Sequence, residues 1–260
     1  MYLSGQHNNR LAFPKRASIL GRPIDCLTMD QAIQIICKAL QEATFFHVVT
    51  ANAEMLYNSR QDKILAKIID SAGMVTADGA GVVIASRILA CPVPERVAGY
   101  DLMLKCLQVA AHGNIPVYFL GSRPDVLTLA VSNALKIYPG LKVVGSHHGY
   151  FGEKDEPLII KEINLLQPGL LLVAMGVPKQ EKWIHFYKEK LPPCVAIGVG
   201  GSFDVLAGKV RRAPLWMQQS GLEWLYRVIK EPSRFKRAAV LPLFMIQVFW
   251  EALVKVMKRC

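Results

Sequence analysis

The stretch GLLLVAMGVPKQEKWIHFYKEK, residues 169–190, decides the fold of this chain. Its first seven residues, 169–175, form a near-continuous apolar run, which is typical of a strand buried on both faces. A Gly-Val-Pro turn follows, and the pattern of residues 178–190 predicts a helix. A buried strand that leads directly into a helix is the repeating unit of a parallel sheet covered by helices.

Five more segments have the same strand-like character: 46–50, 73–77, 116–120, 142–145 and 194–199. Helical patterns lie between most of them, for example at 125–137. Thr28 and Gln31 have the spacing of a capping box, which predicts a helix starting there. The sequence therefore predicts an α/β fold: a Rossmann-like, mainly parallel sheet with helices on both faces.

The segments that directly follow the predicted strands are rich in glycine and small polar residues. They read Thr50-Ala-Asn52, Asp78-Gly-Ala-Gly81, Gly121-Ser-Arg123, His147-His-Gly-Tyr150, Gly176-Val-Pro-Lys-Gln180 and Gly200-Gly-Ser-Phe-Asp204. Ligands of open parallel sheets bind beyond the carboxyl ends of the strands. We therefore expect these segments to form the rim of one site.

Asp78 is the main catalytic candidate, because a carboxylate at a strand exit can act as a general base. The alternative is an N-cap for the next helix. Thr50 and Asn52 suit sugar hydroxyl or acetamido groups, and turn chemistry is their alternative. Arg96 suits a phosphate or carboxylate, with a solvated surface arginine as the alternative.

Weaker signals occur at three other positions. Gly121-Ser122 precedes a proline-initiated helix and resembles a phosphate- or ribose-facing turn. Gln180 is either an amide that reads a uracil edge or a helix-surface amide. The pair His147-His148 lacks further ligands at metal-site spacing, so a loop role is favoured and no metal site is predicted.

The length and composition predict one sizeable α/β domain with a small appendage. The chain has 260 residues, of which 52% are hydrophobic, and its six cysteines are scattered, as expected of reduced thiols in the cytosol. The N-terminus has no secretory h-region. We divide the chain into a polar arm (1–17), a catalytic core (18–204) and a C-terminal helical appendage (205–260).

Positive charge is concentrated in the appendage. Of the net charge of +11, the residues from Val205 onward carry +8, with eleven Lys and Arg against three Asp and Glu. Such asymmetry indicates a phosphate, membrane or nucleic-acid partner. The apolar run at 238–250 is expected to be too short to span a bilayer and to form a helix lying in the membrane interface. An ordinary core helix is the alternative.

The chain has no Asp-x-Asp motif, so an enzyme of sugar nucleotides built on it must neutralise the leaving diphosphate by other means. Arginines suit this task because the guanidinium fork matches phosphate oxygens. Arg227, Arg234 and Arg237 in the appendage are spaced by seven and three residues, which places them on one face of a helix.

The chain resembles the WecG/TagA/CpsF glycosyltransferase family, and especially its teichoic-acid members. The matching runs are TANAEM (50–55), ADGAGVV (77–83), RVAGYDL (96–102), HHGYF (147–151), GVPKQEKWI (176–184), GGSFDVLAGKVRRAP (200–214) and LEWLYRVIKEPSRFKR (222–237). The resemblance implies a GT-E type fold and an inverting transfer without metal or cofactor. The donor would be UDP-N-acetylmannosamine and the acceptor the 4-hydroxyl of GlcNAc on undecaprenyl diphosphate, giving a β-1,4 linkage.

The resemblance also implies roles for individual residues. Asp78 is expected to be the base, and Arg227, Arg234 and Arg237 are expected to close over the diphosphate. The expected substrate contacts are Thr50, Asn52, Arg96, Gly121, Ser122, Tyr150, Gly176, Gln180 and Gly200. The enzyme would work in the cytoplasm, peripheral to the inner face of the cell membrane.

Three other functions compete with this one. Related enzymes transfer a mannosaminuronic acid or capsule sugars, and a uronate donor would need an extra cation that the sequence does not reveal. A non-catalytic nucleotide-binding module is disfavoured by the polar residues Thr50, Asn52 and Asp78. A nucleic-acid partner is disfavoured by the apolar helix within the basic appendage. The sequence leaves open whether the chain forms homo-oligomers.

Overall fold

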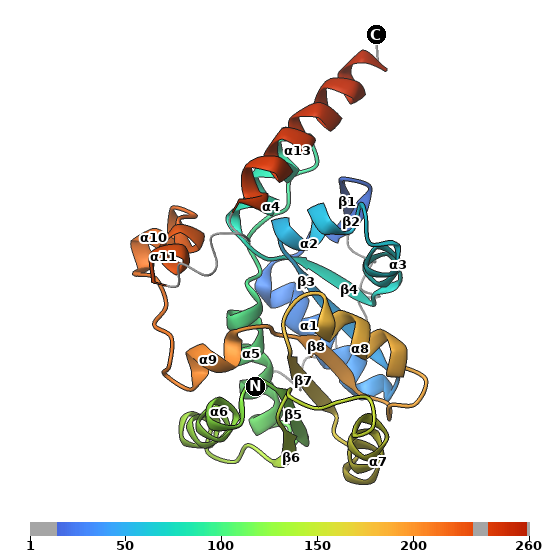
Figure 1. The fold of residues 1–260 in the computed structure, drawn as a ribbon, viewed down its shortest axis with the longest axis vertical. Coiled ribbons are helices and arrows are strands. Elements are labelled where there is room, and N and C mark those ends of the chain that lie inside the picture. Colours follow the sequence, from blue (N-terminus) through green and yellow to red (C-terminus); the bar gives the residue numbers. More distant parts are fainter. Residues whose placement is uncertain (1–14, 231–238, 259–260) are drawn as a thin grey trace.

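A six-stranded parallel sheet forms the centre of the molecule (Figure 1). The computed structural model describes residues 15–230 and 239–258. The strand order is β4-β3-β8-β7-β5-β6. The strands are β3 (Phe46–Ala51), β4 (Met74–Ala77), β5 (Val117–Gly121), β6 (Val143–His147), β7 (Leu170–Ala174) and β8 (Val195–Gly198). All six predicted strands are confirmed, with ends within two residues of the expected ones.

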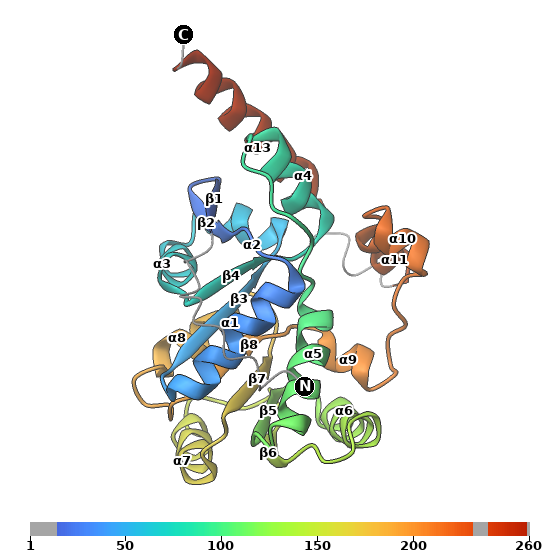
Figure 2. The same ribbon diagram turned by 180° about the vertical axis from the view of Figure 1, so that it is seen from behind.

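Helices cover both faces of the sheet, as predicted. In β7, Leu170 and Leu172 pack on one face while Leu171 and Val173 pack on the other, because successive side chains of a strand alternate. The first face is covered by α1 (Met29–Glu42), α5 (Gly99–His112) and α6 (Pro124–Ile137). The second is covered by α3 (Lys63–Ser71), α7 (Glu156–Leu166) and α8 (Lys179–Tyr187). Figure 2 shows α1 in front of the sheet, opposite to α8.

The predicted capping box at the start of α1 is confirmed. The backbone N–H of Gln31 donates to Thr28 Oγ1 at 3.2 Å, and the N–H of Thr28 donates to Gln31 Oε1 at 2.9 Å. The two bonds satisfy donors that have no partner within the helix.

An antiparallel hairpin of β1 (Arg16–Ile19) and β2 (Arg22–Asp25) was not predicted, and it begins inside the segment assigned to the polar arm. The carboxylate of Asp25 joins it to the sheet by accepting a hydrogen bond from the N–H of Val75 at 2.7 Å. The same carboxylate pairs with Arg16 at 2.7 Å. Four-residue strands give only a weak periodic signal, which explains the omission.

The remaining short helices lie near the strand exits and in the appendage. They are α2 (Ala53–Asn58), α4 (Ala80–Ile88), α9 (Ser202–Leu206), α10 (Leu215–Gln219) and α11 (Glu223–Lys230). Helix α9 crosses the expected boundary between core and appendage. Its Phe203 is fully buried with the ring centroid 5.2 Å from that of Phe119, and Leu206 is buried in the same cluster.

Helix α13 (Val240–Met257) is longer than expected. It has 18 residues with a mean hydropathy of 1.7, so the expectation that this segment is too short to cross a bilayer is wrong by length and composition. The continuous apolar run ends at Trp250, but Glu251 and Lys255 pair one turn apart at 2.8 Å and the helix continues through them.

The ordinary core-helix alternative does not describe α13. Only 11% of the helix is buried, through Phe244 and Val248, which pack with side chains of α2 and α4. A stripe of exposed apolar side chains runs along the helix: Leu243, Ile246, Phe249, Trp250, Leu253, Val256 and Met257. We call these residues the apolar stripe. The C-terminal half of α13 projects from the body of the molecule (Figure 1).

Candidate active site

A pocket of about 300 Å³ opens at the carboxyl ends of β3, β4, β7 and β8. It brings together seven of the predicted site residues: Thr50, Asn52, Asp78, Arg96, Gly176, Gln180 and Gly200. The appendage supplies a second wall through Arg212, Glu223, Trp224 and Val228, and Leu241 of α13 completes it. Residues from the predicted core and appendage thus share one pocket.

Asp78 directly follows β4 and lines the pocket. Its backbone N–H donates to the carbonyl of Ala51 at 2.8 Å, which fixes this exit to the neighbouring strand β3. The N-cap of α4 is Gly79, so the alternative interpretation of Asp78 as the N-cap is wrong. The carboxylate therefore sits at the strand exit where a base for a bound substrate was expected.

Thr50 and Asn52 line the pocket and also support the local backbone. Thr50 is 7% exposed, and its hydroxyl donates to the carbonyl of Gly198 in β8 at 3.1 Å. Asn52 is the N-cap of α2, with Oδ1 accepting from the N–H of Met55 at 2.8 Å. The turn-chemistry alternative thus holds for Asn52, together with its place in the pocket wall.

Gln180 lines the pocket and is not a helix-surface amide. It is 1% exposed, and its Oε1 accepts from the backbone N–H groups of Gly176 at 3.1 Å and Gly200 at 3.0 Å. Its Nε2 donates to Glu181 Oε1 at 2.8 Å. Both ends of the amide are engaged inside the protein, so Gln180 ties together the loops that follow β7 and β8.

Glu181 accepts the hydrogen bond from the Gln180 amide and is fully buried. Burial raises the pKa of its carboxyl to about 7, against the smaller opposing effect of the hydrogen bond from Gln180. The backbone of Gly198 runs close over the pair: a Cβ there would lie 2.6 Å from Gln180 Nε2 and 2.8 Å from Glu181 Oε1. A side chain at this position in β8 would therefore displace both groups.

Two arginines meet carboxylates at the junction of core and appendage. Arg96 has 20% of its side chain exposed and pairs with Glu223 of α11 at 3.3 Å, so it is not a solvated surface arginine. Arg212 donates two bonds to Asp101 of α5, at 2.6 and 3.1 Å. Glu223 also lies 4.0 Å from Arg212, so it stands between the two cations.

The environment of Arg212 keeps it charged. Burial opposes its charge, but the carboxylates of Asp101 and Glu223 outweigh this and raise the pKa of the guanidinium. Its guanidinium carbon lies 4.9 Å from the centre of the Tyr100 ring, a cation–π contact. The junction can therefore present positive charge to an anionic ligand once the carboxylates are displaced.

Three predicted contacts lie outside this pocket. Gly121 has a φ of 123°, and a Cβ there would lie 2.4 Å from the carbonyl oxygen of Ala174, so the fold itself requires glycine. The N–H of Ser122 donates to the same carbonyl at 2.7 Å. Tyr150 is 70% exposed on the loop that follows β6. These residues line the neighbouring exits of β5 and β6.

Of the three predicted appendage arginines, only the backbone of Arg227 belongs to the described part of the structure. Arg234 and Arg237 lie outside the described residues. Arg227 belongs to α11, but its side chain is also outside the described part. Within the described part of the chain, Arg96 and Arg212 are arginines that line the pocket.

The two adjacent histidines at the end of β6 pack against each other and against a nearby aromatic ring. The ring centroids of His147 and His148 are 4.6 Å apart, and His147 also packs edge-on against Phe151. Within residues 15–230 and 239–258, no group of three or more His, Cys, Asp or Glu side chains is arranged to hold a metal ion.

Sequence reasoning missed four residues of the pocket and its junction: Tyr100, Arg212, Glu223 and Trp224. The signal was available, because three of the runs that carry the family resemblance include them. Arg212 pairs with Asp101, which lies 111 positions away in the sequence, so no local pattern reveals this contact.

The fold and the site define a Rossmann-like α/β protein whose polar pocket combines a strand-exit carboxylate with two arginines, as suits a phosphorylated ligand. The chain belongs to the glycosyl transferase WecG/TagA/CpsF family, whose sequence model matches residues 17–258. The predicted family resemblance is confirmed.

Similar curated proteins bear the name N-acetylglucosaminyldiphosphoundecaprenol N-acetyl-beta-D-mannosaminyltransferase. The protein of Bacillus subtilis (strain 168) is 37% identical over 204 residues, which cover 78% of this chain and 79% of the relative. That of Bacillus spizizenii is 35% identical and covers 77% of each chain. That of Staphylococcus aureus (strain MW2) is 34% identical over 235 residues, 90% of this chain and 92% of the relative.

Proposed function

We propose that this protein transfers N-acetylmannosamine from UDP-N-acetylmannosamine to the 4-hydroxyl of GlcNAc-diphospho-undecaprenol, forming the β-1,4-linked disaccharide lipid of wall teichoic acid synthesis. The observation that carries the proposal is the shared pocket, in which Asp78 lies with Arg96 and Arg212 at the carboxyl ends of the strands. The names of the relatives supply the donor sugar and the acceptor.

The proposed chemistry is a single displacement. Asp78 takes the proton of the acceptor hydroxyl as its oxygen forms a bond to the anomeric carbon of the donor. The bond between that carbon and the diphosphate oxygen breaks with the electron pair on UDP, and the configuration inverts. One carboxylate suffices, because a double displacement would need a second one as nucleophile.

The charge of the departing UDP is met by arginines. Arg96 and Arg212 lie on the pocket wall, where Glu223 and Asp101 now hold them in place. In the proposed complex the diphosphate oxygens replace part of this carboxylate pairing. Arg227, Arg234 and Arg237 remain candidates to join them when the appendage closes.

The acceptor lipid places the reaction at the cytoplasmic membrane, and α13 is the proposed membrane contact. Its apolar stripe is exposed over the length of the helix. Burying such side chains in the acyl boundary is favourable by about 25 cal/mol per Å² of apolar surface. The enzyme would therefore sit on the inner face of the membrane with its pocket near the lipid-linked sugar.

The deciding experiment measures UDP release by the purified full-length protein with a polyprenyl-diphosphate-GlcNAc acceptor. UDP-N-acetylmannosamine is compared with the corresponding uronic acid donor, UDP-GlcNAc and UDP-glucose. Acceptor-dependent release with UDP-N-acetylmannosamine alone is expected. Preference for another donor would move the protein to a sister pathway with the same mechanism, and no acceptor-dependent release with any donor would overturn the proposal.

A further inference from the structure

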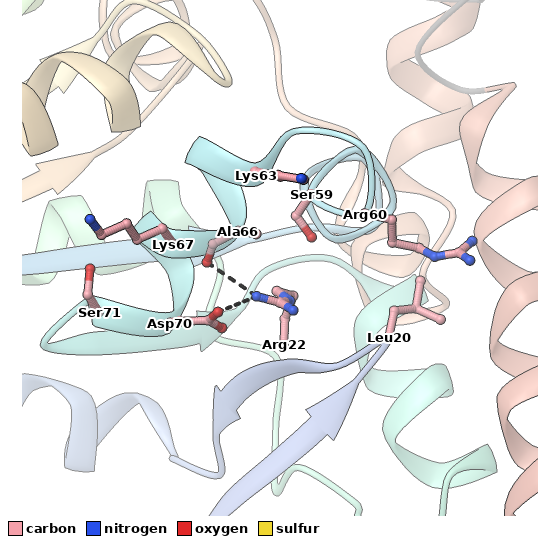
Figure 3. Close-up of a pocket in the computed structure, with 9 residues that line it drawn as sticks. All are labelled: Leu20, Arg22, Ser59, Arg60, Lys63, Ala66, Lys67, Asp70 and Ser71. Atoms are coloured by element: carbon pink, nitrogen blue, oxygen red, sulfur yellow. Dashed lines mark hydrogen bonds and ion pairs between the residues drawn. The ribbon is translucent and has the colours of Figure 1, made fainter.

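A second hollow of the surface lies away from the active-site pocket and shares no lining residue with it. It has a volume of about 600 Å³ and is formed by the β1–β2 hairpin, the end of α2 and the outer face of α3 (Figure 3). Its nine lining residues are Leu20, Arg22, Ser59, Arg60, Lys63, Ala66, Lys67, Asp70 and Ser71. We call it the basic groove.

Positive charge in the groove exceeds negative charge by three, with four cations against the single carboxylate of Asp70. The charge of Arg22 is neutralised within the protein, because Arg22 pairs with Asp70 and donates to the carbonyl of Ala66 at 3.4 Å. In the described part of the chain, Arg60, Lys63 and Lys67 form no ion pair.

The sequence around α3 gathers these cations on one side. The buried face of α3 is made by Leu65, Ile68 and Ile69, so Lys63 and Lys67 both lie on the outer face, one turn apart, with side chains that point in different directions (Figure 3). Like charges at this spacing on a helix repel each other. An anion bound in the groove would remove this repulsion.

The groove is fixed beside the exposed helix α13. Leu20 lines the groove, and its backbone N–H donates to Glu251 Oε2 of α13 at 2.8 Å. In Figure 3, Arg60 and Leu20 extend toward α13, whereas Lys67 points the opposite way. Arg60 therefore lies on the side of the groove that faces α13.

We propose that the basic groove binds the phosphate of an anionic membrane lipid, as a headgroup contact beside α13. This inference rests on the membrane association proposed above. The groove has only Leu20 and Ala66 as apolar lining and no aromatic residue on which a base could stack, so its chemistry suits a phosphate rather than a nucleotide. Its position beside α13 selects a lipid as the source of that phosphate.

The test compares the binding of full-length protein to vesicles of phosphatidylcholine and to vesicles that also contain phosphatidylglycerol. The groove variant carries Arg60→Gln and Lys63→Gln, two exposed positions. The matched control carries Lys142→Gln and Lys161→Gln, exposed positions near β6 and on α7, at the opposite end of the molecule from α13. Both variants lose two positive charges, and thermal unfolding verifies that both are folded.

We expect the groove variant to bind the anionic vesicles about 30-fold more weakly than wild type, which corresponds to about 1 kcal/mol per removed cation. The control should lose at most about twofold, because its charges lie more than a Debye length from the surface. Binding to phosphatidylcholine alone should be equal for all three proteins. Equal losses by the groove and control variants would overturn the proposal.

Two further measurements distinguish a lipid phosphate from free phosphate, and lipid binding from sugar transfer. Inorganic phosphate at constant ionic strength should compete with the vesicles for the wild-type groove. If phosphate saturates the wild-type protein without reducing its binding to phosphatidylglycerol vesicles, the groove holds free phosphate and the lipid assignment is wrong. Sugar transfer to a soluble short-chain acceptor is measured in parallel, and the groove variant should match wild type. Absence of transfer by wild type would refute the proposed reaction without affecting the vesicle comparison.

Discussion

At the scale of single residues, the proposed base and the side chains that tie the pocket loops together are different groups. Asp78 lines the pocket at the end of β4. Gln180 also lines the pocket and ties together the two loops that follow β7 and β8, and the buried Glu181 accepts a hydrogen bond from its amide. The pocket position of Asp78 could be predicted from the sequence, because the residue directly follows a strand. The burial of Gln180 could not be predicted, because it depends on the close passage of Gly198, 18 positions away in sequence.

Asp78→Asn should fold normally and lose about 10²–10⁴-fold in kcat, because the amide cannot accept the proton of the acceptor hydroxyl. Single-turnover transfer with UDP-N-acetylmannosamine measures the loss. Asp30→Asn, an exposed position in the first turn of α1, is the matched control and should keep wild-type turnover. A folded Asp78→Asn protein with near-normal kcat would exclude Asp78 as the base.

Glu181 predicts an unusual pH dependence of stability. Its pKa is about 7 in the folded protein and near 4.3 when unfolded, so the folded state binds more protons between these values and stability falls as pH rises. Glu181→Gln removes this charge while retaining an acceptor for Gln180. Chemical denaturation should show the variant more stable than wild type at pH 8, by up to the order of 3 kcal/mol, and similar to it below pH 4. An equal difference at both pH values would contradict the assignment.

At the scale of elements, the strands and the first helix could be predicted from periodicity and capping, because they depend on residues close in sequence. The hairpin β1–β2 and the true length of α13 could not. The hairpin is held by a hydrogen bond from Val75 to Asp25 across 50 positions. Helix α13 continues past the apolar run because Glu251 pairs with both Lys255 and the hairpin.

The attachment of α10 and α11 to the core depends on the pair between Arg212 and Asp101. Asp101→Asn should weaken it by about 1 kcal/mol, since both side chains are partly exposed and Glu223 remains near Arg212. Local opening would then become about fivefold more frequent. Hydrogen exchange should accelerate in α10 and α11 while β5 and β7 keep wild-type protection. Unchanged exchange in both helices would show that other contacts hold the appendage.

At the scale of the whole molecule, α13 joins the pocket to the proposed membrane surface. Leu241 in its first turn lines the pocket, Phe244 and Val248 anchor it on the core, and the stripe beyond them is exposed. One continuous helix thus fixes the distance between the pocket and the proposed membrane surface. Two-dimensional capture of the enzyme would raise its effective concentration toward the lipid-linked acceptor without a new contact in the pocket.

This arrangement predicts that the stripe is needed only when the acceptor is in a membrane. A variant with Ile246→Ser, Trp250→Ser and Leu253→Ser should keep its unfolding temperature, because the three side chains are exposed and make no part of the core. Transfer to GlcNAc-diphospho-undecaprenol in vesicles should fall by at least about tenfold, since three apolar side chains worth roughly 1.5–3 kcal/mol each no longer enter the bilayer. Transfer to a short-chain soluble acceptor should equal that of wild type. An equal loss on both acceptors would mean that α13 acts on the pocket itself, and no loss on either would remove α13 as the membrane contact.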